Sequence, residues 1–96
     1  MMNETKYEVK QTNRFKKDYR LAKKRGYDIT LLRKIITKLA NDEILPEKYR
    51  DHALTGDWLG YRECHIENDW LLVYRKEADI LVLTLTRTGT HSDLSF

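Results

Sequence analysis

The sequence predicts an α+β domain in which a helical hairpin packs on one face of a small, mostly antiparallel sheet. Three observations lead to this prediction: an alternating segment opens the chain, two amphipathic helical patterns follow, and three β-rich segments with short turns come after them. The order of elements is therefore β-α-α-β-β-β. A chain of 96 residues leaves little room for a second domain, so we expect residues 1–96 to form one domain.

A strand and a basic helix are predicted at the start of the chain. Residues 6–11 alternate as a strand does, and Thr12 or Asn13 can cap the following helix through a side-chain oxygen. This helix should run to about Lys24, because Gly26 is a good helix stop. Its apolar stripe has the spacing i, i+4 and i+7, and consists of Phe15, Tyr19 and Ala22.

A second amphipathic helix is predicted over about residues 29–41, with Asp28 as its cap. The link between the two helices is short, so they should pack as a hairpin. Pro46 ends the helical pattern and opens a connector that is punctuated by glycines. The apolar face of this second helix consists of Leu31, Leu32, Ile35, Ile36 and Leu39.

Three strands are predicted in the second half, over about residues 60–66, 70–76 and 80–87. Val, Ile, Leu, Tyr and Thr dominate them, as is typical of strands. The links at 67–69 and 77–79 are short enough for antiparallel hairpins. The last of the three strands is apolar on both faces, which predicts an interior position in the sheet.

The first of these hairpins determines which side chains share a face. If residues 67–69 form a three-residue loop, Glu63 and His65 point to one face, opposite to that of Cys64. The pattern alone leaves open which face the helices cover. The same register predicts three facing pairs: Arg62 with Tyr74, Cys64 with Leu72, and Ile66 with Trp70.

Charge is distributed unevenly along the chain, whose net charge is +3. Residues 1–38 carry twelve basic and four acidic residues, whereas residues 39–96 carry six basic and eleven acidic ones. A first half this basic favours a polyanionic partner such as nucleic acid, although a solvated, lysine-rich helix face explains it equally well. The basic residues that a nucleic acid would meet on the first helix include Lys16, Lys17, Arg20, Lys23 and Lys24.

Several classes of protein are disfavoured by what the sequence lacks. No run approaches the ~18 apolar residues of a membrane span, and the opening residues contain no apolar stretch typical of a secretory signal. Cys64 is the only cysteine, so it can form no internal disulfide and no Cys-rich zinc site, and its mid-strand position predicts a structural thiol. We therefore expect a cytoplasmic protein with no membrane association and no metal or other cofactor.

Three histidines, His52, His65 and His91, lie in or beside predicted turns and strand ends. Histidine titrates near pH ~6.5, so it can give or take a proton at neutral pH. With Asp69 and Arg87 they offer a base, an acid and a fixed cation, which suits RNA cleavage by the ribose 2′-OH. The same set can instead bind an anion without catalysis. Zinc binding by the three histidines is a weaker alternative, because their spacing matches no local motif.

The segments DHALTGDWLGYRECHIENDWLLVY and RTGTHSDL resemble the YafQ branch of the RelE/ParE toxin superfamily. The pattern of that family is Asp-His-x-Leu-x-Gly, then Tyr-Arg-(Asp/Glu)-x-His, then Asp-Trp, and finally Arg-x-Gly-(Ser/Thr)-His. Each part is present at matching spacing, and the front half fits the family's strand and basic helices. The resemblance therefore spans nearly the whole chain.

This resemblance implies a toxin of a type II toxin–antitoxin pair, which enters the ribosomal A site and cuts mRNA there. The implied partners are the ribosome, mRNA, and an acidic antitoxin similar to DinJ or RelB that covers or distorts the site. The basic helices would contact phosphates of ribosomal RNA, while the sheet and the tail would hold mRNA.

The resemblance also implies a role for each matching polar residue. His91 would be the general acid, and His65 with Asp69 would form the base side. Arg87 would hold the scissile phosphate. His52 would position the substrate or share in proton transfer.

Two aromatic residues complete the implied site. Trp70 would support the site or stack on a base. The family usually has a phenylalanine four residues after its last histidine, whereas Phe96 follows His91 by five residues. Phe96 either reaches the same place through a shift of the tail or no longer makes that contact.

Three rival functions are compatible with such a sequence. A ParE-like toxin of the same fold binds DNA gyrase and cuts no RNA, but an inhibitor that acts by binding does not need the histidines. A non-catalytic RNA-binding domain would bind RNA with a steep salt dependence and leave it intact. In the third alternative, every histidine is a structural or surface residue.

Overall fold

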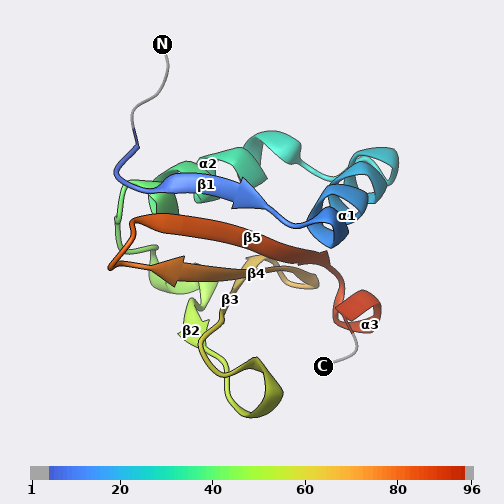
Figure 1. The fold of residues 1–96 in the computed structure, drawn as a ribbon. Coiled ribbons are helices and arrows are strands. Elements are labelled where there is room, and N and C mark those ends of the chain that lie inside the picture. Colours follow the sequence, from blue (N-terminus) through green and yellow to red (C-terminus); the bar gives the residue numbers. More distant parts are fainter. Residues whose placement is uncertain (1–4, 95–96) are drawn as a thin grey trace.

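The computed structural model describes residues 5–94, which form a mixed five-stranded sheet with helices against it (Figure 1). The strand order is β1-β5-β4-β3-β2; β1 is parallel to β5, and the other neighbouring pairs are antiparallel. The predicted fold class is confirmed. The helices and strands are β1 (Glu8–Gln11), α1 (Asn13–Lys24), α2 (Ile29–Ala40), β2 (His52–Ala53), β3 (Arg62–Glu67), β4 (Trp70–Glu77), β5 (Val82–Gly89) and α3 (His91–Leu94), with 3-10 turns at Glu47–Tyr49 and Gly56–Trp58.

The structure adds two short elements to the predicted order. The two-residue strand β2 extends the sheet beyond β3, and the single helical turn α3 follows β5. Both are too short for a hydrophobic period to reveal them in the sequence. They are important for the site, because His52 lies in β2 and His91 begins α3.

Side chains at the predicted positions cap both long helices. Thr12 Oγ1 accepts a hydrogen bond from the backbone N–H of Phe15 at 3.0 Å, and Asp28 Oδ1 accepts one from Leu31 at 3.1 Å. Gly26 follows the end of α1 with a φ of +80°, a left-handed conformation that glycine adopts without a Cβ penalty. No helix within residues 5–94 is long and apolar enough to cross a membrane.

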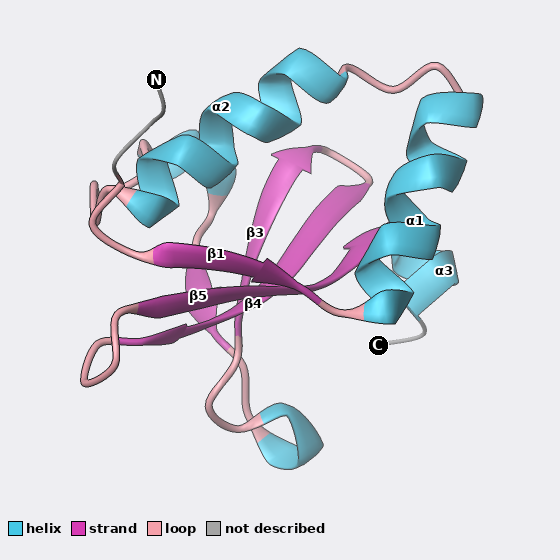
Figure 2. Cartoon of the chain, turned by 45° about the horizontal axis from the view of Figure 1, so that its top comes forward, coloured by secondary structure: helices cyan, strands magenta, loops and turns pink. Residues whose placement is uncertain are grey.

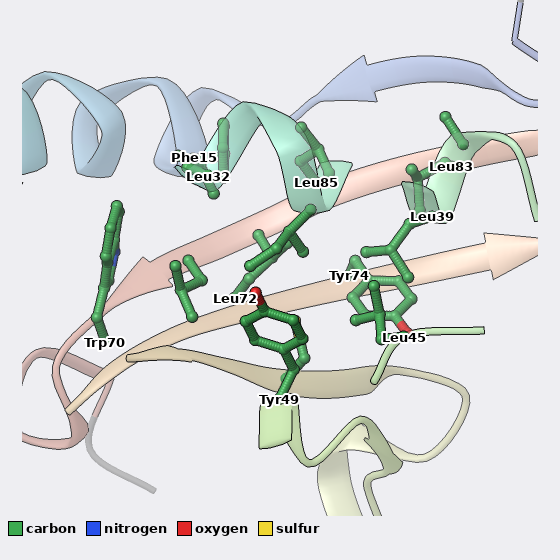
Figure 3. Close-up of a cluster of buried hydrophobic side chains, with 14 of the residues drawn as sticks. Phe15, Leu32, Leu39, Leu45, Tyr49, Trp70, Leu72, Tyr74, Leu83 and Leu85 are labelled. Carbon is green, nitrogen blue, oxygen red and sulfur yellow. The ribbon is translucent and has the colours of Figure 1, made fainter. Parts of the chain in front are cut away.

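One face of the sheet is covered by α1 and α2, which lie obliquely to each other (Figure 2). The main core fills the space between these helices and strands β3 to β5, as the side chains in Figure 3 show. Cys64 is fully buried in this core, and its burial raises the pKa of the thiol, so the prediction of a structural thiol is confirmed. The largest fully buried side chains of this core are Phe15, Leu32, Ile35, Leu39, Leu72, Tyr74, Leu83 and Leu85.

The opposite face of the sheet carries the polar residues of β3, and we call it the open face. Cys64 belongs to the core beneath the helices, so the alternation of the strand turns Glu63 and His65 to the other side. A smaller apolar cluster, centred on Leu71 and Val73 of β4, lies on that side. The helices therefore cover the face of Cys64, a point that the sequence pattern left open.

The turn between β3 and β4 is one residue shorter than predicted. It consists of Asn68 and Asp69, and an irregularity at Ile66 absorbs the extra residue of β3. Trp70 therefore pairs with Glu67, and the predicted pairing of Trp70 with Ile66 is wrong. The two other predicted pairs are present: Arg62 with Tyr74, and Cys64 with Leu72.

A second irregularity lies in β5, which is an interior strand as predicted. Leu85 and Arg87 pair with adjacent residues of β4, so Thr86 is the extra residue of a bulge. Strict alternation from Leu85 would turn Arg87 toward the helices. The bulge gives that core position to the buried Thr88, so Arg87 is not one of the core-facing residues of β5.

β5 also begins later than predicted. The expected strand started at residue 80, but Leu81 has a φ of +55°, which is incompatible with extended backbone. The strand therefore starts at Val82.

Candidate active site

The sheet brings together three histidines that are far apart in the sequence. His52 in β2 pairs with Glu63 in β3, and His65 follows two residues later on the same face. His65 in turn pairs with Leu71, which lies opposite the last residue of β5, two positions before His91. The ring centres are 6.4 Å apart for His52 and His65, and 5.6 Å apart for His65 and His91. The register of the sheet thus forms one row of imidazoles.

Asp69, in the β3–β4 turn, holds His91 at two points. Its Oδ1 accepts a hydrogen bond from the backbone N–H of His91 at 2.9 Å and lies 2.6 Å from Nδ1 of the ring. The backbone N–H, followed by the ring, lowers the pKa of the Asp69 carboxyl below its usual value. An ionised carboxylate only accepts, so Nδ1 carries a proton and Nε2 of this half-exposed ring is left for chemistry.

This pairing differs from the grouping that the family resemblance implied. There, Asp69 belonged with His65 on the base side, whereas the structure places its carboxylate against His91. The reason is geometric, because the two-residue turn sets Asp69 beside the end of β5, where α3 begins.

A buried carboxylate faces the other two histidines. The side chain of Glu63 is 8% exposed, and its Oε1 lies 3.4 Å from Nε2 of His52 and 3.9 Å from Nε2 of His65. The carbonyl oxygen of Arg50, 2.7 Å from Nδ1, fixes the ring of His52 on its other side. A carboxylate is costly to bury unless it has partners, and here the two imidazoles are placed to be those partners.

Arg87 is held by α1 rather than by the histidines. Its Nε donates to Asp18 Oδ2 at 2.7 Å and its Nη2 to Oδ1 at 3.3 Å, and the two side chains are only 16% and 12% exposed. Asp18 Oδ2 also accepts from the backbone N–H of Thr88 at 3.1 Å. This two-point contact uses one edge of the guanidinium, so Nη1 and the second N–H of Nη2 can still bind a phosphate.

Trp70 supports this arrangement from the core. It is 2% exposed and packs against Tyr27, with ring centres 4.9 Å apart. Its Nε1–H donates to Thr88 Oγ1 at 2.9 Å, and that hydroxyl donates to the carbonyl of Leu71 at 2.6 Å. The stacking role is therefore wrong for Trp70 in this structure, since no ring face is open to a base. A supporting role is compatible with its position.

The remaining predictions concern Phe96, a metal or cofactor, and the basic residues of α1. Phe96 is outside the described residues. Within residues 5–94, no group of three or more His, Cys, Asp or Glu side chains is arranged to hold a metal ion, and the lack of a cofactor stays a prediction. The five predicted basic residues of α1 are all exposed: Lys16, Lys17, Arg20, Lys23 and Lys24.

Comparison with known proteins gives the family. A family model described as "Bacterial toxin of type II toxin-antitoxin system, YafQ" matches residues 7–96. The chain belongs to the YafQ family. Among curated YafQ proteins, the mRNA interferase toxin YafQ of Escherichia coli (strain K12) is 40% identical over 88 residues, which cover 91% of this chain and 94% of that protein. The putative toxin YafQ of Haemophilus influenzae is 40% identical over 97 residues, covering 96% and 95%.

Solved structures of YafQ toxins and their relatives share the fold. A chain in the crystal structure of the Escherichia coli DinJ–YafQ toxin–antitoxin complex has a TM-score of 0.85 and 39% identity, covering 93% of this chain and 97% of that one. A metal-bound toxin from Helicobacter pylori has a TM-score of 0.87 and 39% identity, covering 92% and 98%. The resemblance seen in the sequence is therefore confirmed.

Two carboxylates of the candidate site, Asp18 and Glu63, were not among the predicted residues. A signal for Asp18 existed, because it is the only acidic residue of the basic helix α1. Glu63 shares the face of His65 by simple alternation, but its contact with His52 depends on β2, which no pattern predicts.

Proposed function

We propose that this chain is the toxin of a type II toxin–antitoxin pair and cuts mRNA in the A site of the ribosome. The observation that carries the proposal is the row of three histidines with Asp69 and Glu63 on the open face, in a chain of the YafQ family. The related Escherichia coli protein is named an mRNA interferase. Neighbouring imidazoles supply acid and base groups that a surface for binding alone does not need.

In the proposed reaction the RNA supplies its own nucleophile. A base removes the proton of a ribose 2′-OH, and the oxygen attacks the adjacent phosphorus. The P–O2′ bond forms as the P–O5′ bond breaks, and an acid protonates the departing 5′ oxygen. The products are a 2′,3′-cyclic phosphate and a 5′-hydroxyl end.

His91 fits the role of the acid and His65 that of the base. Asp69 fixes the Nδ1 proton of His91, so Nε2 faces the substrate and the carboxylate compensates positive charge on the ring. A separation of 5.6 Å between the two ring centres lets both reach one phosphodiester, because each needs hydrogen-bond reach of about 2.6–3.2 Å. His52, linked to His65 through Glu63, positions the substrate or shares in proton transfer.

Arg87 fits the role of phosphate ligand. Asp18 binds the edge of the guanidinium that is formed by Nε and one N–H of Nη2, so the three other N–H groups can donate to a phosphate from a fixed position. Charge that builds on the phosphoryl oxygens in the transition state is stabilised by such a preorganised cation.

The proposed partners are the ribosome, mRNA and an acidic antitoxin, all in the cytoplasm. The exposed basic residues of α1 would contact phosphates of ribosomal RNA. Support for an antitoxin comes from the crystallised complex of the Escherichia coli relative with DinJ. An antitoxin would keep the toxin inactive by covering or distorting the open face.

Cleavage on ribosomes tests this proposal. Ribosomes that translate a defined mRNA are incubated with the wild type, with His91→Gln, or with Asp57→Asn as a control in an exposed turn. We expect wild type and control to cut in the A-site codon, and His91→Gln to cut at least ~10²-fold more slowly. If no RNA is cut while wild type and His91→Gln both arrest growth, gyrase binding of the ParE type becomes the better proposal.

A further inference from the structure

The helix that begins with His91 is held by a carboxylate that the proposed reaction does not use. Asp93 Oδ2 accepts a hydrogen bond from the backbone N–H of Thr90 at 2.9 Å, and Thr90 Oγ1 accepts one from the backbone N–H of Asp93 at 3.0 Å. This reciprocal pair is a capping box that encloses His91. A four-residue helix such as α3 cannot form from local propensity alone, so contacts of this kind determine whether it exists.

Arg25, directly after α1, binds the same carboxylate. Its Nη1 lies 2.7 Å from Asp93 Oδ2 and its Nη2 lies 3.3 Å from Oδ1, a two-point contact between residues 68 positions apart. The guanidinium holds the pKa of the Asp93 carboxyl well below its usual range, so this carboxylate is ionised at neutral pH. α3 is thereby fixed to the end of α1, as well as to the β3–β4 turn through Asp69.

The backbone of β5 fits closely against this carboxylate. A Cβ atom placed on Gly89 would lie 2.9 Å from both Cβ and Oδ2 of Asp93, closer than such atoms pack. Asp93 therefore lies directly on the last residue of the strand. The Asp93 side chain is therefore held between β5, the start of α3 and Arg25.

We propose that Arg25 and Asp93 are positioning residues, which clamp α3 to α1 and so fix His91 over the open face. Without this clamp, His91 is held by Asp69 on one side while the turn of helix that carries it is free to shift. α1 and its C-terminal end would then position two residues of the site, His91 through Arg25 and Arg87 through Asp18. The inference rests on the proposed function, because positioning of His91 matters only if the ring acts on RNA.

The effect on catalysis follows from how strictly proton transfer depends on geometry. A displacement of ~1 Å in a catalytic group can cost ~10²-fold in rate. Asp93→Asn keeps a side-chain oxygen for the capping box but removes the charge that Arg25 binds. Arg25→Gln removes the guanidinium and leaves α3 its own cap. Arg25→Lys keeps the positive charge but cannot bind the carboxylate at two points.

The test measures single-turnover cleavage on ribosomes, with the rate at saturation and the half-saturating toxin concentration determined separately. We expect Asp93→Asn and Arg25→Gln each to lower the saturated rate about tenfold, with little change in half-saturation. The double variant should be no slower than either single one, and Arg25→Lys should recover part of the rate. Asp42→Asn is the matched control, because it breaks a 2.6 Å ion pair with Lys76 at the other end of β4.

Amide hydrogen exchange reports on the clamp without RNA. The backbone N–H of His91 donates to Asp69, and that of Leu94 donates to the carbonyl of Thr90. Both amides should exchange faster in the clamp variants than in the wild type, and at the wild-type rate in the control. If both clamp variants cleave as fast as the wild type and their amide exchange is unchanged, the positioning role is wrong while the proposed function stands. Absence of cleavage by the wild type refutes the proposed function, and the positioning role with it.

Discussion

Three carboxylates determine how the polar side chains of the site are oriented. Asp69 fixes the proton on one nitrogen of His91, Glu63 faces two imidazoles, and Asp18 occupies one edge of the Arg87 guanidinium. Because an ionised carboxylate only accepts hydrogen bonds, each contact also determines which nitrogens remain for substrate. The carboxylates of Asp69 and Asp18 therefore determine which nitrogens of His91 and Arg87 can contact a substrate.

Asp69→Asn tests this at the residue with the shortest contact to a histidine. The variant keeps the size of the side chain but loses the negative charge that lies 2.6 Å from Nδ1 of His91. We expect the saturated cleavage rate to fall about 10–10²-fold, with binding to ribosomes retained. Asp79→Asn, in the exposed β4–β5 turn, is the control. An Asp69→Asn rate equal to that of the wild type would contradict the assigned role.

Short irregular elements place the catalytic candidates, whereas the long regular ones place the core. The bulge at Thr86 takes Arg87 out of the core row, the two-residue turn sets Asp69 beside α3, and β2 contributes His52. Each of these features departs from the regular pattern of its strand. They occur where the site is, as bulges beside active sites commonly do.

Asp18→Asn tests the link between α1 and β5. Loss of the carboxylate leaves the largely buried guanidinium of Arg87 without its ionic partner, so the free energy of unfolding should fall by about 1–3 kcal/mol. Cleavage should slow as well, because Arg87 is no longer aimed. Urea unfolding and single-turnover cleavage measure the two effects. Faster cleavage by Asp18→Asn would show instead that Asp18 masks Arg87 from phosphate.

The sequence predicts the long elements well, because their signals are local. Caps at Thr12 and Asp28 and the glycine after α1 act within a few residues, so the helix ends follow from the chain itself. The bulge at Thr86 and strand β2 depend on neighbours that are distant in sequence, and no local period reveals them. For the same reason the histidines could be named from the sequence, whereas the partners Glu63 and Asp18 required the fold.

At the scale of the whole molecule, the histidines and the exposed lysines of α1 lie on different elements, although Asp18 of α1 also holds Arg87. The histidines lie on the open face of the sheet, while α1 and α2 cover the other face (Figure 2). Such a division lets a toxin contact ribosomal phosphates with one part while another acts on mRNA. The exposed lysines of α1 are then expected to supply a sequence-independent, salt-dependent share of the affinity.

Lysine variants test the role of this charge. We expect Lys16→Gln, Lys17→Gln and Lys23→Gln, combined, to weaken ribosome binding and to flatten its dependence on salt by roughly 0.7–0.9 in log–log slope for each phosphate that is no longer bound. Binding is measured by co-sedimentation at several salt concentrations. Lys10→Gln, which removes one exposed lysine from β1 instead of α1, is the control. An unchanged slope in the triple variant would rule out phosphate binding at these positions.

Acid stability is a second property of the whole molecule. Asp42, Asp69 and Asp93 all have pKa values lowered by their partners in the folded state. Each therefore stabilises the fold above the ordinary aspartate pKa of ~3.9, and this contribution is lost as the pH falls through the folded values. The free energy of unfolding in urea should decrease from about pH 5 downward, and less steeply in Asp93→Asn. An equally steep decrease in that variant would contradict the ion pair with Arg25.

The proposed reaction depends above all on a nucleophile that the RNA itself provides, and one substitution in the message tests this. Ribosomes are loaded with an mRNA that carries a single 2′-deoxy sugar at the mapped cleavage site, beside the all-ribose message. We expect wild-type toxin to cut the ribose message, leaving 2′,3′-cyclic phosphate and 5′-hydroxyl ends, and to leave the 2′-deoxy site intact. Cleavage of the 2′-deoxy message at the same site and a similar rate would contradict the proposed reaction, because another nucleophile must then attack.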